Sequence, residues 1–280
     1  MRWNHRAGVV IGWLMYWCFP SYSNRVRVRL SDAGLCASEG ECRALLKEAS
    51  RQAGKAASEW GLVWFAPRAT IDRLCIECDG WSAVETARLQ ARGVIFLIPH
   101  LGSFPMAVRY LARHLPVTAL YRLPRQRWLN PIMMAGSENA DLAMAPTNMK
   151  GIENLLRALR RGEAIVLPPD QAPNSGGGVW ADFFGRPAYT MTLAKKLQRA
   201  TDAALIAAFA ERLPYGQGFR LEFHPVPAEN FDEAGLNRVI EEMVRRCPAQ
   251  FQWSYNRYKI PRGAYKKTFG GKASSLDASH

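Results

Sequence analysis

Short apolar runs alternate with helical segments through the middle of the chain, and no other sequence feature limits the fold as strongly. The runs show little alternation of polar and apolar residues, as is typical of strands buried on both faces. Strands that alternate with helices predict an α/β fold, with a mixed, mostly parallel sheet flanked by helices. The four runs are "VIFLIPH" (94–100), "VTALYR" (117–122), "AIVLPPDQ" (164–171) and "AALIAAFAER" (203–212).

Amphipathic spacing predicts the helices around these strands. The segment 40–61 has apolar residues at near-helical spacing interrupted by Gly54, and the segment 81–93 is closed by Gly93. The alternating run "FRLEFHPV" (219–226) predicts a further strand, with an edge position as one option. The remaining predicted helices are 106–114, 151–161, 190–200 and 236–246.

Polar side chains stand where the predicted strands end. Ligands of α/β sheets bind at the carboxyl ends of parallel strands, and His100, Arg122 and Asp170 all lie at such ends. His100 could act as a general base, because a neutral imidazole accepts a proton near neutral pH. A packed or capping histidine is the alternative. Gly102 would permit close approach of a substrate, and Ser103 could cap the helix that follows.

Asp170 and two arginines complete the candidate site residues. Asp170 lies in "LPPDQAP", where two prolines stiffen the approach to the strand end, and a capping or turn role is equally compatible. Arg122 and Arg186 could pair with carboxylates inside the fold or bind phosphate. No GxSxG, HExxH or GxGxxG motif stands in a fitting context. The common hydrolase, metalloprotease and dinucleotide-binding classes are therefore excluded.

The charge of the chain predicts an anionic partner. The 280 residues are 48% hydrophobic, which suffices for the core of one catalytic domain, and the formal net charge is +13. Nucleic acid, membrane headgroups, a phosphorylated substrate or an acidic carrier protein would all fit this charge. Nucleic acid is disfavoured, because the arginines spread along the whole chain without an RNP-like or helix-turn-helix signature.

The cysteines give no clear metal or disulfide signature. Cys75 and Cys78 form one CxxC motif, but no second Cys/His pair follows at a zinc-ribbon spacing. We expect buried free thiols in a reducing compartment, with structural zinc or redox use as the alternative. The other four cysteines are Cys18, Cys36, Cys42 and Cys247.

The N-terminal apolar segment, residues 7–19, indicates a membrane contact. It falls short of the roughly 20 residues that span a bilayer as a helix, and it lacks the cleavage site of a secretory signal. Arginines flank it on both sides, and it contains Trp13, Tyr16 and Trp17. This composition is typical of an interfacial membrane-anchoring helix. A buried amphipathic helix is the alternative.

Four segments, in their order and spacing, resemble the bacterial lipid A late acyltransferases, the lauroyl/myristoyl acyltransferases of lipopolysaccharide biosynthesis. The resemblance runs from about Gly12 to Pro261. Several segments agree at once, which makes the resemblance specific. The segments are "PHLGSF", "YRLPRQRWLN", "LPPDQAPNSGGGVWADFFGRPAYT" and "PAQFQWSYNRYK".

The resemblance implies a glycerolipid acyltransferase-like fold and an enzyme at the cytoplasmic face of the bacterial inner membrane. Its co-substrate would be an acyl thioester of acyl carrier protein or coenzyme A, and no metal or other cofactor is implied. The acceptor would be a hydroxyl of a lipid A precursor, an anionic phosphorylated glycolipid. The implied partners are acyl carrier protein, this glycolipid and the inner membrane surface, without nucleic acid.

The resemblance also implies roles for particular residues. His100 would deprotonate the acceptor hydroxyl, which attacks the thioester carbonyl. The acyl chain would need a hydrophobic groove, which the apolar residues of the strands together with Trp180, Phe183 and Phe184 could supply. The residues assigned to catalysis are His100, Asp170 and Arg122, and those assigned to substrate binding are Arg186, Gly102, Ser103 and Tyr121.

One residue departs from the family's motif. The family's histidine motif ends in an acidic residue, and Pro105 stands in that place here. A proline cannot orient an imidazole or stabilise the imidazolium. Three interpretations remain: another carboxylate, such as Asp170 or Glu138, reaches His100; the enzyme is slow or uses another base; or the fold has lost acyl transfer. In the last case the chain would be a peripheral protein that binds anionic lipid or acyl carrier protein; an acyltransferase for another lipid is a further alternative.

The resemblance also divides the chain. Residues 1–30 would form a hydrophobic and basic membrane-association segment, 31–262 the acyltransferase domain and 263–280 a disordered tail. The chain begins part-way through what resembles the family's longer hydrophobic anchor. Either the start codon lies upstream of Met1, or the anchor is shortened to an interfacial helix.

Overall fold

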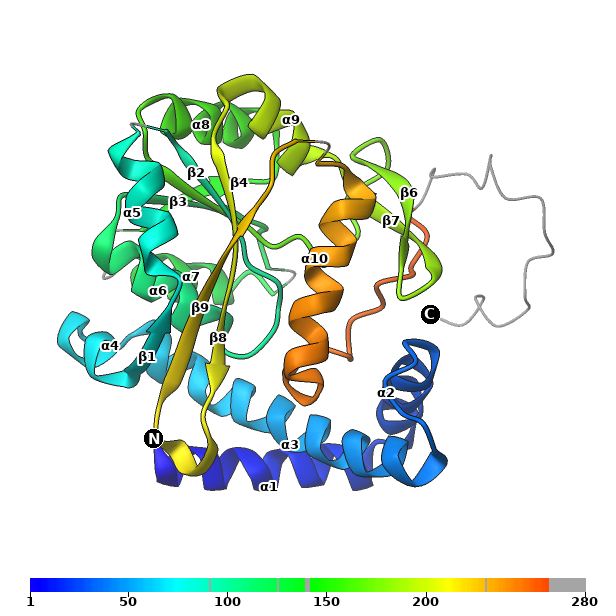
Figure 1. Cartoon of the computed structure of the whole chain (residues 1–280). Coiled ribbons are helices and arrows are strands. Elements are labelled where there is room, and N and C mark those ends of the chain that lie inside the picture. The colour runs from blue at the N-terminus through cyan, green and yellow to red at the C-terminus, as the bar shows by residue number, and fades with distance from the viewer. Residues whose placement is uncertain (91, 125, 139–141, 230, 262–280) are drawn as a thin grey trace.

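A seven-stranded sheet forms the centre of the computed structural model (Figure 1), which describes residues 1–90, 92–124, 126–138, 142–229 and 231–261. The strand order is β1-β9-β8-β2-β5-β3-β4. Neighbouring strands are parallel except β8 and β9, which are antiparallel. The predicted mixed, mostly parallel sheet flanked by helices is confirmed. The strands are β1 (Cys75–Asp79), β2 (Val94–Leu97), β3 (Val117–Tyr121), β4 (Leu142–Pro146), β5 (Ala164–Leu167), β8 (Ala204–Arg212) and β9 (Phe219–Val226).

Helices cover both faces of the sheet. Successive residues of the central strands point to opposite faces, and since these residues are apolar, both faces must be buried. Leu97 and Leu205 belong to a core shared with α2 (Pro20–Asp32), α8 (Met149–Arg160), α9 (Leu193–Thr201) and α10 (Glu233–Arg246). Phe96 and Ile206 belong to the core on the other face, shared with α4 (Arg68–Leu74), α5 (Trp81–Leu89) and α6 (Phe104–His114). In Figure 1, α5 and α6 lie to the left of β8 and β9, and α10 lies to their right.

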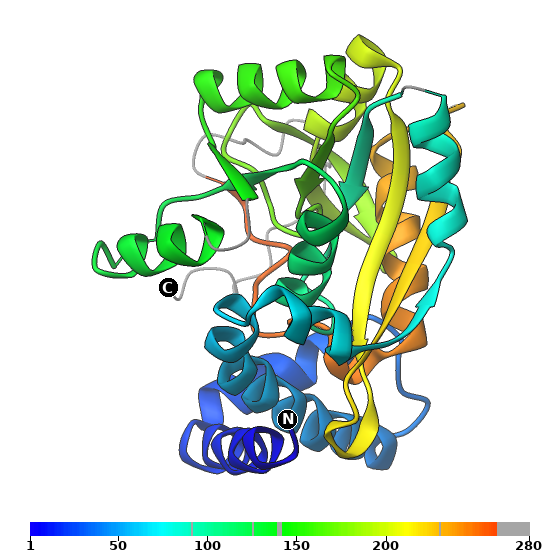
Figure 2. The same cartoon turned by 90° about the vertical axis from the view of Figure 1, so that its left-hand side faces the viewer.

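Two long helices lie below the sheet in both views (Figures 1 and 2), and glycines bring them together. A Cβ on Gly54 of α3 (Glu39–Trp64) would stand 2.0 Å from the carbonyl oxygen of Gly8 in α1 (Arg2–Cys18). Gly54 therefore does not interrupt α3. It lets the backbone of α1 approach closely.

A buried charge cluster ties this helical layer to the sheet. Glu59 of α3 is 1% exposed and accepts hydrogen bonds from Arg212 at the end of β8. His5 of α1 lies 3.1 Å from the same carboxylate. Because burying one charge alone is costly, the three groups hold α1, α3 and β8 in a fixed relation.

Several elements differ from the prediction. The strand 219–226 is not at the edge, because β1 pairs with its outer side. Local sequence pattern did not predict β1, β4, α7 (Leu129–Glu138) or the hairpin of β6 (Gly178–Phe183) and β7 (Arg186–Met191). Thr190 and Met191 belong to β7, and the helix predicted from residue 190 starts at Leu193. Two short 3₁₀ turns, Pro214–Gly216 and Pro248–Gln250, complete the described elements.

The expectation of buried free thiols is wrong for four cysteines. Cys36 and Cys42 form a disulfide, because the turn from α2 into α3 brings their Cα atoms within 5.2 Å. Cys18 and Cys78 are free but exposed, and the CxxC pair therefore stands at the surface, on the edge strand. Cys247 is free and buried, as expected.

The N-terminal segment forms helix α1, which has two different faces. His5, Gly8 and Gly12 are buried against the rest of the fold, whereas Trp3, Leu14 and other apolar side chains are exposed. Among the described residues, no helix has the length and apolar character needed to cross a membrane. The tail 263–280 lies outside the described residues.

Candidate active site

His100 stands at the carboxyl end of β2, and its backbone is held by two neighbours. Ile98 donates its N–H to Leu167 of β5 (3.0 Å), and the carbonyl of His100 accepts from the N–H of Gln252 (3.0 Å). The β2 strand is apolar and wholly buried. The first polar side chain after β2 is that of His100, and its imidazole therefore lies at the border between the core and the surface.

Asp170 follows the neighbouring strand β5 and reaches His100 directly. Leu97 and Leu167 are register partners in the parallel β2–β5 pair, so both chains leave the sheet side by side. The Nδ1 of His100 lies 2.9 Å from one carboxylate oxygen of Asp170, and the backbone N–H of His100 donates to the other at 3.0 Å. The Asp170 side chain is 3% exposed and that of His100 is 26% exposed. The carboxylate is thus enclosed, while the imidazole keeps one side open.

Each member of this pair changes the pKa of the other. Burial by itself lowers the pKa of His100, but the charge and the hydrogen bond of Asp170 outweigh it and raise the pKa above its ordinary value near 6.5. Burial by itself raises the pKa of Asp170, and the charge and hydrogen bonds of His100 bring it below its ordinary value. The carboxylate therefore stays ionised near neutral pH and makes the imidazole a stronger base.

The contact with Asp170 also fixes the orientation of the ring. A proton on Nδ1 that is donated to Asp170 leaves a lone pair on Nε2. The side-chain amide nitrogen of Gln171 lies 3.4 Å from this Nε2. The imidazole stacks on the Phe104 ring with a centroid distance of 5.1 Å and an angle of 10°. Nε2 is thus the ring atom that can accept a proton from a ligand.

An apolar cavity of about 440 Å³ opens beside His100. Its walls come from the helical layer and from the segment after α10. The small side chains Ala49, Ala53 and Ala56 of α3 leave space along one wall. Larger apolar side chains line much of the rest, together with polar ones such as Gln52 and Gln250. The larger apolar side chains are Met15, Tyr22, Val26, Trp60, Phe104, Phe251 and Trp253.

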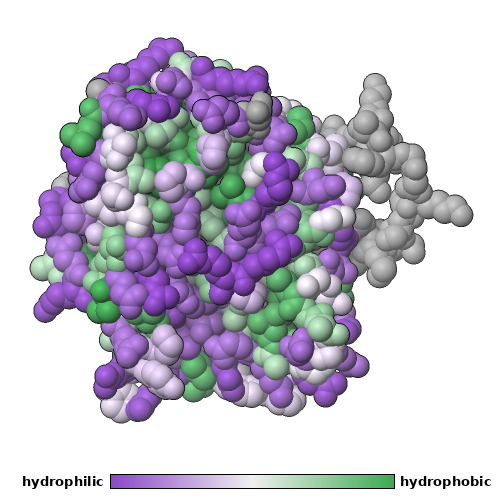
Figure 3. Space-filling model, viewed as in Figure 1, coloured by the Kyte–Doolittle hydropathy of each residue, from purple (hydrophilic) through white to green (hydrophobic). Residues whose placement is uncertain are grey.

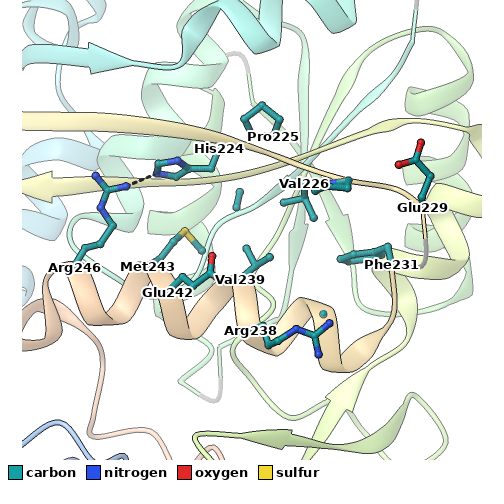
Figure 4. A pocket seen from close by; sticks show the side chains of 13 residues that line it. His224, Pro225, Val226, Glu229, Phe231, Arg238, Val239, Glu242, Met243 and Arg246 are labelled. Atoms are coloured by element: carbon teal, nitrogen blue, oxygen red, sulfur yellow. Dashed lines mark hydrogen bonds between the residues drawn. The ribbon is translucent and has the colours of Figure 1, made fainter.

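A second cavity, of about 400 Å³, lies between β9 and α10 and shares none of these residues. Figure 3 shows hydrophobic side chains gathered over the sheet beside the upper part of α10, within a largely hydrophilic face. The close view in Figure 4 shows Arg246 bonded to His224, and Arg246 also pairs with Glu222 at 2.8 Å. These charges satisfy one another, and no residue predicted for the site lines this cavity. The cavity beside His100 is therefore the candidate active site.

Gly102 and Ser103 both line the candidate site. Gly102 has φ +62°, and a Cβ there would stand 2.0 Å from the carbonyl oxygen of Ala210. Strand β8 thus makes one close approach to Gly102, and the substrate-binding role of Gly102 stays a prediction. Ser103 occupies the N-cap position of α6, yet its side chain makes no capping hydrogen bond. The predicted capping role of Ser103 is wrong.

The predicted arginines occupy two different places. Arg122 is exposed just beyond β3. Burial raises the pKa of Tyr255, and the positive charge of Arg122 acts in the opposite direction, which places Arg122 near Tyr255. Arg186 forms an ion pair with Asp32 of α2 and stacks over the Tyr258 ring at 4.3 Å. Of the two options that the sequence left open for Arg186, the structure shows pairing with a carboxylate.

The remaining predicted residues are placed as follows. Tyr121 donates its hydroxyl to Asn130 at 2.8 Å and is only partly buried. Glu138 is exposed at the end of α7, so Asp170 is the carboxylate that the structure brings to His100. Phe183 and Phe184 are buried in the core and, like Trp180, do not line the cavity. A groove formed by these three side chains stays a prediction, and this cavity does not provide it.

Sequence reasoning missed the cavity wall and Gln171. The alanines of α3 looked like ordinary residues of an amphipathic helix, and only the packing of α3 against the site shows that they line a space. Gln171 follows Asp170 directly in "LPPDQAP", and that adjacency was the one available signal. Among the described residues, no group of three His, Cys, Asp or Glu side chains is arranged to hold a metal ion.

Comparison with known proteins gives a consistent result. Residues 5–260 match the family described as bacterial lipid A biosynthesis acyltransferase. The lipid A biosynthesis palmitoleoyltransferase of Escherichia coli K12 is 27% identical over 248 residues, which cover 86% of this chain and 75% of that protein. The lipid A biosynthesis lauroyltransferase of the same organism is 24% identical over 271 residues, or 94% and 83% of the two chains. A lipid A biosynthesis acyltransferase of Haemophilus influenzae is 24% identical over 233 residues, or 79% and 72%.

Proposed function

Because the chain belongs to the bacterial lipid A biosynthesis acyltransferase family, we propose that it transfers a fatty acyl chain from a thioester to a hydroxyl of a phosphorylated lipid A precursor. The thioester donor is acyl carrier protein or coenzyme A. The observation that carries the proposal is the His100–Asp170 pair at the mouth of an apolar cavity. The pair supplies a base, and the cavity offers space for a hydrocarbon chain.

His100 acts as the general base in this proposal. Its Nε2 takes the proton of the acceptor hydroxyl as the oxygen attacks the thioester carbonyl. The imidazolium that forms is stabilised by the Asp170 carboxylate, which is hydrogen-bonded to Nδ1. When the tetrahedral intermediate collapses, the same proton passes to the departing thiolate. Asp170 thus takes the place that Pro105 leaves empty, which supports acyl transfer over a role in binding alone.

The acyl chain lies in the cavity along α3. Apolar side chains make up much of the cavity lining, with Gln52, Glu59 and Gln250 among the polar ones, and the alanines of α3 leave the width that a hydrocarbon chain needs. Burying each methylene is worth about 0.8 kcal/mol. The cavity therefore contributes binding energy at a distance from the reacting carbon, and it sets which chain lengths fit.

The positive charge of the chain attracts both substrates. A formal net charge of +13 favours an acidic carrier protein and the phosphates of the acceptor. Arg122 is exposed beyond β3 and close to Tyr255, whose hydroxyl bonds the backbone of Ala172, two residues from Asp170. We assign Arg122 to a phosphate of the acceptor. Arg186 is engaged by Asp32 and would reach a phosphate only by leaving that carboxylate.

Helix α1 attaches the enzyme to the cytoplasmic face of the inner membrane. Its outward side chains include Trp3, Leu14 and Trp17, which are 80%, 56% and 67% exposed. Arg2 and Arg6 lie on the same helix and are exposed. Aromatic and aliphatic side chains beside arginines suit the interface of an anionic bilayer. The acceptor lipid would then reach the site from the membrane surface.

The function is tested with purified protein in detergent and radiolabelled donors. Acyl carrier protein and coenzyme A thioesters are each combined with a tetra-acylated lipid A precursor that carries its phosphates or has been dephosphorylated. We expect transfer to the phosphorylated acceptor, faster from the carrier protein, and a large loss of kcat/KM with the dephosphorylated one. Absence of transfer from either donor, in protein that still binds anionic vesicles, would instead favour the peripheral binding protein.

A further inference from the structure

Ser103 carries a buried hydroxyl without a partner. The residue is 1% exposed, and its Oγ makes no hydrogen bond within the described part of the chain. Ser103 lines the same cavity as His100, but its Oγ is itself almost wholly covered in the free protein, so a ligand reaches the hydroxyl only after a rotation about the Cα–Cβ bond. A buried hydroxyl that bonds to nothing costs about 1–3 kcal/mol, so a position of this kind is unusual unless a ligand completes it.

The backbone around Ser103 is fixed from two sides. Its own N–H donates to Ala210 of β8 at 2.8 Å, and the N–H of Gly102 donates to Gln250 at 3.1 Å. The carbonyl of Gly102 accepts from Arg212 at 3.2 Å. The hydroxyl can rotate, but the Cβ that carries it cannot move without breaking these bonds. Ser103 is therefore held in place before any ligand arrives.

Pro105 removes one of the capping hydrogen bonds open to Ser103. A serine at the N-cap position accepts a hydrogen bond from the second or third amide of its helix. Pro105 occupies one of the first two positions of α6 and has no N–H. The side chain makes no capping bond to the third position either. Pro105 thus removes one N–H that could donate to the Ser103 oxygen, while the O–H proton of Ser103 has no acceptor among the described residues.

The end of α6 adds a favourable field at this point. The first amides of an α-helix have no acceptor within the helix, and the N-terminus carries a partial positive charge. No acidic side chain stands in the first turn of α6 to cancel it. A negative charge that develops beside Ser103 would be stabilised by both the hydroxyl and the helix end.

We propose that the Ser103 hydroxyl donates a hydrogen bond to the thioester carbonyl oxygen and stabilises the oxyanion that forms on it. This inference rests on the proposed function. The acceptor oxygen gives its proton to Nε2 of His100 and bonds to the carbonyl carbon, and the carbonyl π electrons move to the oxygen facing Ser103. Collapse restores the double bond, breaks the carbon–sulfur bond and returns the proton from His100 to the thiolate. Ser103 keeps its own proton throughout.

The test compares Ser103→Ala with Ser137→Ala in the full chain. Ser137 is also 1% exposed, but it lies in α7 and its hydroxyl bonds the carbonyl of Met134 at 2.7 Å. Ser103→Ala should lower kcat by about 100-fold, the usual effect of losing one oxyanion donor, with little change in the KM for the donor. Its melting temperature should equal or exceed that of the wild type, because no hydrogen bond of the free protein is lost. Ser137→Ala should show the reverse: wild-type kcat and a lower melting temperature.

Three outcomes would count against the inference. Wild-type kcat in Ser103→Ala, in an assay where His100→Ala is inactive, would overturn it and leave the proposed function standing. A fall in melting temperature with unchanged kcat would show that Ser103 is a structural residue. Absence of transfer by the wild type with every donor would overturn the proposed function, and the role of Ser103 with it.

Discussion

At the residue scale, the account depends on one carboxylate that reaches one imidazole from a neighbouring strand. The family's motif places the acidic residue on the same segment as the histidine, and Pro105 stands there in this chain. Asp170 comes from the end of β5 and makes two hydrogen bonds to His100. The two residues are 70 positions apart in the sequence, and only the parallel pairing of β2 and β5 makes them neighbours.

The pKa of His100 provides a prediction at this scale. Asp170→Asn removes the carboxylate charge, so that burial alone acts on the imidazole and the pKa falls from above its ordinary value of 6.5 to below it. In the wild type, the base form and hence kcat/KM are lost as the pH falls through the raised pKa. In Asp170→Asn the base form persists to lower pH. NMR titration of selectively labelled histidine measures both pKa values directly.

His114 is the internal control for this titration. Burial lowers its pKa below 6.5, and the charges that act on it are those of Asp72 and Arg113, not that of Asp170. Its titration should be the same in the wild type and in Asp170→Asn. If the His100 resonance titrates at the same pH in both proteins, Asp170 does not act on the imidazole as described.

At the element scale, helix α3 combines two roles that its sequence does not separate. Its length was predicted well: the segment 40–61 is close to the observed Glu39–Trp64. Local sequence predicts that Gly54 interrupts the helix, because a glycine is unfavourable inside a helix. Its use is in tertiary packing, where it admits the backbone of α1. Local sequence cannot report such a contact.

Local sequence pattern predicts the central strands of the sheet but not the edge strand or the hairpin. The central strands β2, β3, β5 and β8 were predicted because each is a continuous apolar run. The edge strand β1 was missed because its residues are mostly exposed and include two acidic residues, Glu77 and Asp79. The hairpin of β6 and β7 follows a glycine-rich stretch, which predicted only a loop. Local pattern therefore locates the candidate residues at the ends of the central strands. It does not locate the cavity wall, which depends on how α3 packs against the site.

The alanines of α3 give a prediction about chain length. Ala53→Leu adds three carbon atoms to the cavity wall and should shift donor preference toward shorter acyl chains. Each methylene that no longer fits costs about 0.8 kcal/mol, or about fourfold in kcat/KM. Competition between donors of different chain length measures the shift. Ala44→Leu is the control, because Ala44 lies on the same helix but is exposed and does not line the cavity. An unchanged chain-length preference in Ala53→Leu would place the acyl chain elsewhere.

At the scale of the whole molecule, the layer formed by α1 and α3 connects the sheet, the candidate site and the exposed face of α1. α1 packs on α3, and α3 lines the cavity that holds His100. Glu59 and Arg212 fix this layer to the end of β8, next to Gly102. A membrane contact through α1 would therefore hold the cavity at a constant distance from the bilayer surface.

The membrane contact predicts a specific binding defect. Trp3→Ser together with Trp17→Ser should reduce binding to vesicles that contain anionic lipid by at least about tenfold, because each removes a large apolar side chain from the interface. Binding by the wild type should also weaken as the salt concentration rises. Vesicle sedimentation measures both effects.

Trp128→Ser is the matched control for the vesicle experiment. Trp128 is 66% exposed, as strongly as Trp17, but it lies just before α7. This variant should bind vesicles like the wild type. Normal binding by the double α1 variant, or a loss with Trp128→Ser alone, would show that α1 is not the surface that contacts the membrane.

The central claim is that His100 is the base and that Asp170 supports it without an acidic residue at position 105. The most direct test measures acyl transfer to the lipid A precursor by the wild type, His100→Ala and Pro105→Glu side by side. We expect transfer by the wild type, loss of transfer in His100→Ala and no gain in Pro105→Glu, because Nδ1 already bonds Asp170. An inactive wild type whose activity appears in Pro105→Glu would contradict the claim and show that the proline had silenced the enzyme.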